Sequence, residues 1–187
     1  MKLKQTTTVE TKVESKSPIS EKVQKLLVEQ LAHEMYNHNL YMSFSNFYGV
    51  KGYAILEEYY RLRAYEEYVH HRWIKDYLNE NDVEYKYPTI PEVTEQYTEM
   101  TTPFELTVDK EVETTELIYA IAKTAMEEGD YGTFAWLNGN DSEKGALVLE
   151  QIEEEAISRT ALDIAQMEGS WLRKEKSIMN VYKKDVD

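Results

Sequence analysis

Two consecutive segments, each about 30 residues long, carry apolar side chains with the period of an α-helix. The first begins at Ser17-Pro18, where we expect the serine to cap a helix and the proline to lie in its first turn, and reaches about Tyr48. The second extends from about Tyr53 to Asn81, after a short break that contains two glycines. Each helix would be roughly 40 Å long at 1.5 Å per residue. Helices this long and this close in sequence predict an antiparallel pair within a bundle.

The segment that follows this pair decides how the next helix runs. From Val83 to Thr102 the sequence has two prolines and no periodicity, so we expect an irregular connection. It is long enough to run the length of the bundle. A third helix that begins at Thr102-Pro103 and ends near Gly129 would therefore lie parallel to the second helix.

The last third of the chain supplies two more helices. We expect Asp141 or Ser142 to cap a fourth helix that stops at Gly169. A short fifth helix would follow, from Trp171 to about Lys183. No segment needs to be a strand, so the predicted class is all-α: a four-helix bundle with a long crossover between helices two and three and a short fifth C-terminal helix.

Composition bounds the kind of protein. The chain of 187 residues fits one helical domain, residues 18–187, preceded by a polar N-terminal extension, residues 1–17. A formal charge of −14 argues against a nucleic-acid partner, which needs a basic face. No apolar run is long enough to cross a membrane, and the N-terminus lacks the apolar core of a secretory signal. With no cysteine in the chain, disulfides are excluded, and we expect a cytoplasmic protein.

Metal-ligating residues recur within the apolar stripes of four helices. Glu67 and His70 form a Glu-x-x-His pair whose side chains project from the same face of helix two. One such pair is common on solvated helices, but each of the other three helices also places acidic or amide side chains at matching depth. These are Glu34 on the first helix, Glu111 on the third, and Gln151 and Glu154 on the fourth. Buried carboxylates that converge imply bound cations, and carboxylates with an imidazole suit Fe, Mn or Zn.

With these motifs the sequence resembles the bacterial non-haem ferritins from residue 19 to about 183. The resemblance implies a ferritin-like four-helix bundle with a di-iron centre. The resemblance implies that Glu34, Glu67 and His70 bind the first iron, and that Glu67 bridges to a second iron bound by Glu111 and Glu154. It places Gln151 near the second iron and Tyr41 beside the centre. It also implies a third iron site formed by Glu66, Glu150 and Glu153. In such ferritins Fe(II) is oxidised by dioxygen or peroxide, and the ferric product is stored as mineral inside a homo-oligomeric cage of 24 subunits.

Three other interpretations are weaker. A bacterioferritin would have a haem-ligating methionine directly after Glu67 and a second Glu-x-x-His, but here Tyr68 follows Glu67 and helix four has Gln151-x-x-Glu154, so no haem is expected. A DNA-protecting miniferritin has its metal site between subunits, which neither the ligand set nor the acidic charge favours. A ferritin-like bundle with an impaired or structural metal site, which binds iron without fast oxidation, stays open as the alternative.

The sequence departs from the ferritin pattern in two places. The N-terminal extension has no assigned role. Aligning Gln151 and Glu154 with the family requires about seven extra residues between Leu137 and Glu150, and without this insertion Lys144 and Leu147 would take the ligand positions. The insertion, within residues 138–149, would lie where ferritin shells have their threefold channels. We therefore expect an altered iron portal, with Asp141 or Glu143 as guiding carboxylates.

Overall fold

The computed structural model describes residues 17–139 and 146–186 of the chain, with side chains described up to residue 183. The described residues form helices and no strand, as predicted. In chain order the helices are α1 (Glu21–Val50), α2 (Ala54–Glu80), α3 (Thr102–Glu127), α4 (Tyr131–Leu137), α5 (Leu147–Gln166) and α6 (Trp171–Val186). None of these helices is long and apolar enough to cross a lipid bilayer. Residues 1–16 of the N-terminal extension lie outside the described residues.

The first helix begins later than the sequence indicated. Ser20, not Ser17, is the N-cap of α1, and its hydroxyl accepts a hydrogen bond from the backbone N–H of Val23 at 3.3 Å. The hydroxyl of Ser17 instead accepts from the backbone N–H of Ile19, so the Ser17 prediction was wrong by one turn. Both serines precede a helical run, and local sequence does not distinguish which one the helix uses.

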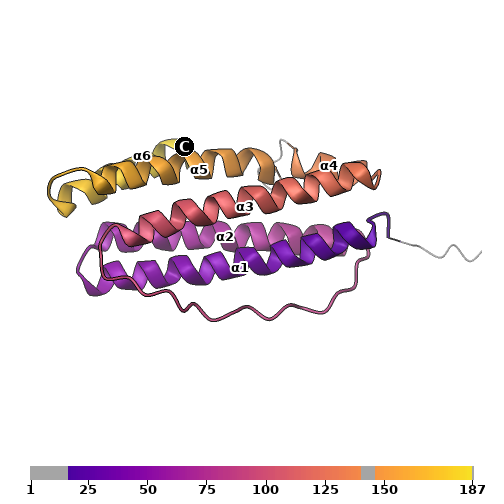
Figure 1. The fold of residues 1–187 in the computed structure, drawn as a ribbon, viewed down its shortest axis with the longest axis horizontal. Helices are drawn as coiled ribbons and strands as arrows, with labels where there is room; N and C mark the ends of the chain where they lie inside the picture. Colours follow the sequence, from indigo (N-terminus) through magenta and orange to yellow (C-terminus); the bar gives the residue numbers. More distant parts are fainter. Residues whose placement is uncertain (1–16, 140–145, 187) are drawn as a thin grey trace, which may run out of the picture.

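The crossover follows the predicted path. In Figure 1, α1 and α2 are antiparallel, and the chain then returns along the outside of α1, so that α3 runs in the direction of α2. The Tyr48 hydroxyl donates to the backbone carbonyl of Met100 at 2.6 Å, which ties the end of the crossover to α1. The ring of Tyr97 packs against Phe44 and Phe47, so aromatic side chains fasten this irregular segment.

The fourth helix of the bundle is divided in two. Asp130 caps α4 by accepting from the backbone N–H of Thr133 at 2.9 Å, and α5 starts only at Leu147, after Ala146 at a positive φ of 73°. The backbone N–H of Ala146 donates to the carbonyl of Trp136, so the ends of the intervening segment lie together. This division falls where the insertion was predicted. The prediction that Asp141 or Ser142 caps the fourth helix was wrong, because the N-cap of α5 is Ala146. The expected portal residues Asp141 and Glu143 lie outside the described residues, as do Ser142 and Lys144.

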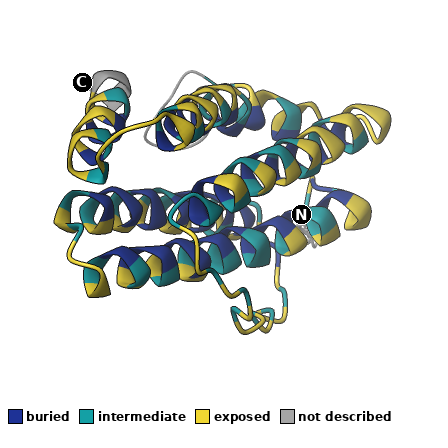
Figure 2. Ribbon diagram, turned by 60° about the vertical axis from the view of Figure 1, so that its left-hand side comes forward, coloured by how far each residue is buried: buried dark blue, intermediate teal, exposed yellow. Residues whose placement is uncertain are grey.

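A polar layer separates two apolar cores. Figure 2 shows that the buried faces of the helices turn toward the bundle interior. One core cluster lies at the end of the bundle where α1 begins and includes Leu27, Leu31, Ile74, Leu78, Ile118 and Ile121. The other lies at the opposite end and includes Phe44, Tyr48, Tyr60, Phe104, Ile178 and Tyr182, the last two from α6. Along α1, α2, α3 and α5 most of the buried residues between the two clusters are polar, among them Glu34, Glu67, His70, Glu111 and Glu154.

Candidate metal centre

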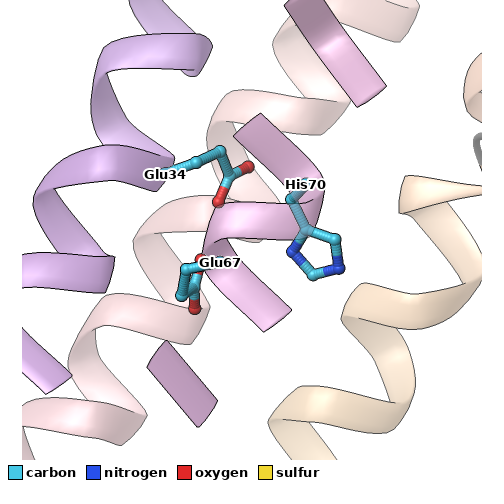
Figure 3. Close-up of side chains that lie close together, drawn as sticks. All are labelled: Glu34, Glu67 and His70. Atoms are coloured by element: carbon cyan, nitrogen blue, oxygen red, sulfur yellow. The ribbon is translucent and has the colours of Figure 1, made fainter. Parts of the chain in front are cut away.

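The first cluster in this layer joins α1 to α2. Glu34, Glu67 and His70 are buried, and each offers one ligand atom within 4.8 Å of the others. In Figure 3, Glu34 from α1 and Glu67 and His70 from α2 lie around one point in the bundle. The side-chain amide of Gln30, one turn before Glu34, donates to Glu34 Oε1 at 2.6 Å and orients that carboxylate. The sequence analysis did not single out Gln30, although its spacing of one turn from Glu34 was a usable signal.

The second cluster shares a residue with the first. Glu67, Glu111 and Glu154 also bring ligand atoms within 4.8 Å of one another, so Glu67 belongs to both groups. The Tyr41 hydroxyl donates to Glu111 Oε1 at 2.5 Å, and the Gln151 amide donates to Glu111 Oε2 at 2.8 Å. The structure therefore brings together, from four helices, the residues that the sequence assigned to the two metal positions.

The buried carboxylate oxygens of this centre are suited to binding a cation. The oxygens Glu34 Oε2, Glu67 Oε2 and Glu154 Oε2 are buried and have no hydrogen-bond partner among the described residues. Carboxylate oxygens left unpaired in a protein interior are costly unless a cation binds them. A set of carboxylates with one imidazole suits Fe, Mn or Zn. The first cluster would hold one ion through Glu34, Glu67 and His70, and the second would draw on Glu67, Glu111 and Glu154.

Burial and mutual repulsion make the centre take up protons when it holds no cation. Burial raises the pKa of Glu67 well above its usual range, and the carboxylates of Glu111, Glu34 and Glu154 raise it further. Burial likewise raises the pKa of Glu154 to about 8. For His70 burial lowers the pKa, but Glu154 and the hydrogen bond to Glu150 outweigh it and raise the pKa to about 10. A metal ion would replace these protons, because only deprotonated side chains act as ligands.

Arg63 is the residue that the sequence analysis missed. It lies on α2 one turn before Glu67, and it is only 1% exposed. Its guanidinium donates to Glu111 Oε1 at 2.5 Å and lies 3.6 Å from Glu154 Oε1, inside the second cluster. Arg63 lies on the same side of the helix as Glu67, so a charged residue among the predicted ligands was a usable signal in the sequence. A search for metal ligands passes over it, because arginine is not a metal ligand.

The predicted third iron site is arranged differently. Glu66, Glu150 and Glu153 line one cleft of about 440 Å³, which also reaches His70. Glu66 accepts a hydrogen bond from the Tyr182 hydroxyl of α6 at 2.7 Å, and Glu150 Oε2 lies 2.8 Å from His70 Nε2. Among the described residues these three carboxylates do not form a group with converging ligand atoms. The third site therefore stays a prediction.

Comparison with known proteins is consistent with this geometry. The family model of the ferritin-like domain matches residues 24–164. The chain belongs to the ferritin family. This ferritin is 27% identical over 160 residues to the bacterial non-heme ferritin of Staphylococcus saprophyticus, with 86% of this chain and 89% of the relative covered. It is 30% identical over 151 residues to the bacterial non-heme ferritin of Campylobacter jejuni, with 81% and 86% covered.

Solved structures agree with the fold. The open pore ferritin of the hyperthermophilic archaeon Archaeoglobus fulgidus has a TM-score of 0.77 and 26% sequence identity to this ferritin. The match covers 86% of this chain and 97% of the archaeal chain. The resemblance to bacterial non-haem ferritins and the ferritin-like bundle are thus both confirmed.

Proposed function

We propose that this ferritin stores iron and oxidises its substrate Fe(II) at the buried centre. The observation that carries the proposal is the group of Glu34, Glu67 and His70, whose ligand atoms lie within 4.8 Å of one another. Within the described part of the chain, Glu34 Oε2 and Glu67 Oε2 have no hydrogen-bond partner. An iron-storage role is supported by the family and by the bacterial ferritins among its relatives.

Different residues of the centre bind the two Fe(II) ions and position the ligands. Glu34, Glu67 and His70 bind the first Fe(II), and Glu67 extends to a second ion beside Glu111 and Glu154. Two Fe(II) ions together supply two electrons, which with two protons reduce dioxygen to hydrogen peroxide or hydrogen peroxide to water. Anionic oxygen ligands favour the ferric product because they suit its higher charge. Tyr41 and Gln151 hold Glu111 in place through their hydrogen bonds.

Iron reaches and leaves this centre through the acidic side of the bundle. The cleft lined by Glu66, Glu150 and Glu153 reaches His70 and Glu154, so it connects the surface to the centre. The ferric product would pass into a homo-oligomeric shell, as implied by the resemblance to ferritins, with 24 subunits as the proposed assembly. The net charge of −14 favours the attraction of cations to such a shell. A cytoplasmic location remains a prediction.

Aerobic oxidation of Fe(II), followed by the absorbance of the ferric product, tests the proposal. Glu67→Ala and His70→Ala should each abolish the fast phase, because each removes a ligand of the first ion. A matched control is His38→Ala on α1, a half-buried histidine that contacts the backbone carbonyl of Ala64 rather than the centre. If Glu67→Ala and His70→Ala both oxidise iron as fast as the wild type, the centre is wrongly assigned.

A second candidate function has its own supporting observation. Because Arg63 is already paired with Glu111, the chain could be a ferritin-like bundle that binds iron without fast oxidation. The two candidates differ in one measurement. A wild type that binds Fe(II) without oxygen, yet oxidises it no faster than His70→Ala, would favour the second candidate over the first.

A further inference from the structure

A buried arginine lies where the second cluster would hold its metal ion. The guanidinium of Arg63 is 2.5 Å from Glu111 Oε1, 3.6 Å from Glu154 Oε1 and 3.4 Å from Ser158 Oγ. Its other carboxylate neighbour is Glu66, 3.4 Å away on the side of the cleft. Arginine does not lose its proton in proteins, so this is a permanent positive charge within the ligand set.

The two clusters are unequal as a result. In the first, Glu34 Oε2 and Glu67 Oε2 are free to bind an ion, since no described residue hydrogen-bonds to them. In the second, Glu67 Oε2 and Glu154 Oε2 are likewise unpaired among the described residues, but both oxygens of Glu111 already accept hydrogen bonds, Oε1 from Arg63 and Tyr41 and Oε2 from Gln151. A second ion would have to take Glu111 from Arg63 and would also meet the repulsion of a guanidinium at close range.

We propose that Arg63 takes the place of the second metal ion in the resting centre. One divalent ion binds tightly at Glu34, Glu67 and His70, and a second binds only when Arg63 releases Glu111. Glu66 provides a destination for the released guanidinium, since it already contacts Arg63 and its carboxylate is held by Tyr182. Arg63 is thus a specificity-determining residue that sets how many ions the centre holds. The inference rests on the proposed function in one respect: it assumes that metal ions bind at the same centre.

Metal stoichiometry tests this inference without any redox chemistry. The full-length assembled protein, freed of metal, is titrated with Zn²⁺ and, separately, Co²⁺, and the bound ions per subunit are counted by calorimetry and equilibrium dialysis. The wild type should bind one ion tightly at the centre and a second at least tenfold more weakly. Arg63→Gln, which removes the charge, should bind the second ion at least tenfold more tightly than the wild type does.

The matched control is Arg61→Gln, which removes an arginine on the exposed side of α2 that forms its ion pair with Glu58, away from the centre. It should bind as the wild type does. His70→Ala should lose the tight ion, which assigns that ion to the first cluster. Two equally tight ions in the wild-type centre would overturn the inference, and so would an Arg63→Gln protein whose second ion stays weak.

A melting experiment adds a second signature. Arg63→Gln leaves the buried Glu111 and Glu154 without their counter-charge, so its metal-free melting temperature should fall below that of the wild type. Saturating Zn²⁺ should raise its melting temperature more than that of the wild type, because two ions now bind. If the variant does not fold, the wild-type stoichiometry still decides. If neither protein binds any tight ion, the proposed function fails as well, whereas two equal ions with fast Fe(II) oxidation would refute the Arg63 inference alone.

Discussion

Replacing Glu67 with glutamine should make the metal-free protein more stable while removing its response to metal. Glu67 is only 1% exposed, belongs to both clusters, and lies within ligand distance of Glu34, Glu111 and Glu154. Its Oε2 atom has no hydrogen-bond partner among the residues that the structure describes. Glutamine has nearly the same shape but does not ionise, so Glu67→Gln removes a buried titrating group without opening a cavity.

The size of the effect follows from proton uptake. Because the folded-state pKa of Glu67 lies well above its usual value, the buried side chain takes up a proton on folding at neutral pH. This uptake costs about 1.4 kcal/mol for each pH unit above the unfolded pKa of about 4.3, until the folded pKa is reached. Glutamine needs no proton, so at pH 7 we expect a gain of up to about 3.7 kcal/mol in the free energy of unfolding. For a domain of this size that corresponds to a melting temperature up to about 7–15 °C higher.

The gain should depend on pH with a defined sign. The folded-state pKa of Glu67 lies well above its usual value, mainly because the side chain is buried. Stability from this group is therefore present at pH values below the unfolded pKa of about 4.3 and is lost as the pH rises toward the folded pKa. Glutamine does not titrate, so the variant should exceed the wild type by more at pH 8 than at pH 5.

Scanning calorimetry at pH 5 and pH 8, first in EDTA and then with excess Zn²⁺, measures the melting temperatures of the wild type and of Glu67→Gln with and without metal. Zinc should raise the melting temperature of the wild type and leave Glu67→Gln almost unchanged, because the shared ligand is weakened in both clusters. Glu116→Gln, an exposed carboxylate on α3, is the matched control and should change neither result. A metal-free Glu67→Gln protein that melts below the wild type at pH 8 would refute the conclusion that the buried carboxyl group of Glu67 lowers stability.

Three further predictions concern the fold and the ligands. Ser20→Ala removes the cap that accepts from Val23 and should cost about 1 kcal/mol, seen as a lower melting temperature, whereas Ser17→Ala should have less effect. Tyr48→Phe removes the hydrogen bond to the Met100 carbonyl and should cost about 1 kcal/mol by the same measurement, with faster amide exchange at the end of the crossover. Zinc binding at pH 7 should release protons into a weakly buffered indicator solution, because the pKa of His70 is raised to about 10, and metal affinity should therefore rise with pH.

Local periodicity accounts for most of what the sequence predicted correctly. A helix repeats its faces every 3.6 residues, so polar residues inside an apolar stripe must lie in the interior at the same depth as their helical neighbours. That rule alone assigns Glu34, Glu67, His70 and Glu111 to the buried faces of their helices. The irregular segment before Thr102 likewise predicted the crossover, since its length matches that of a helix.

The start of α1 and the position of α6 depended on more than local pattern. Ser17 and Ser20 are both acceptable caps, and the choice depends on where the first turn packs. The short α6 packs its apolar side, including Ile178, onto one core cluster, and only this docking brings Tyr182 to Glu66. The sequence alone did not predict the packing of Ile178 or the hydrogen bond between Tyr182 and Glu66, because each joins residues far apart in the chain.

The second metal position shows most clearly what tertiary structure decided. The sequence by itself determined which carboxylates enter the interior, because helical spacing assigns each to the buried face. It did not determine what neutralises them. Arg63 has a long, flexible side chain that can extend to solvent or fold inward, and spacing alone does not choose between the two. Packing of α3 against α1 and of α5 against α3 brought Glu111 and Glu154 within its reach, and their buried charges draw the guanidinium inward.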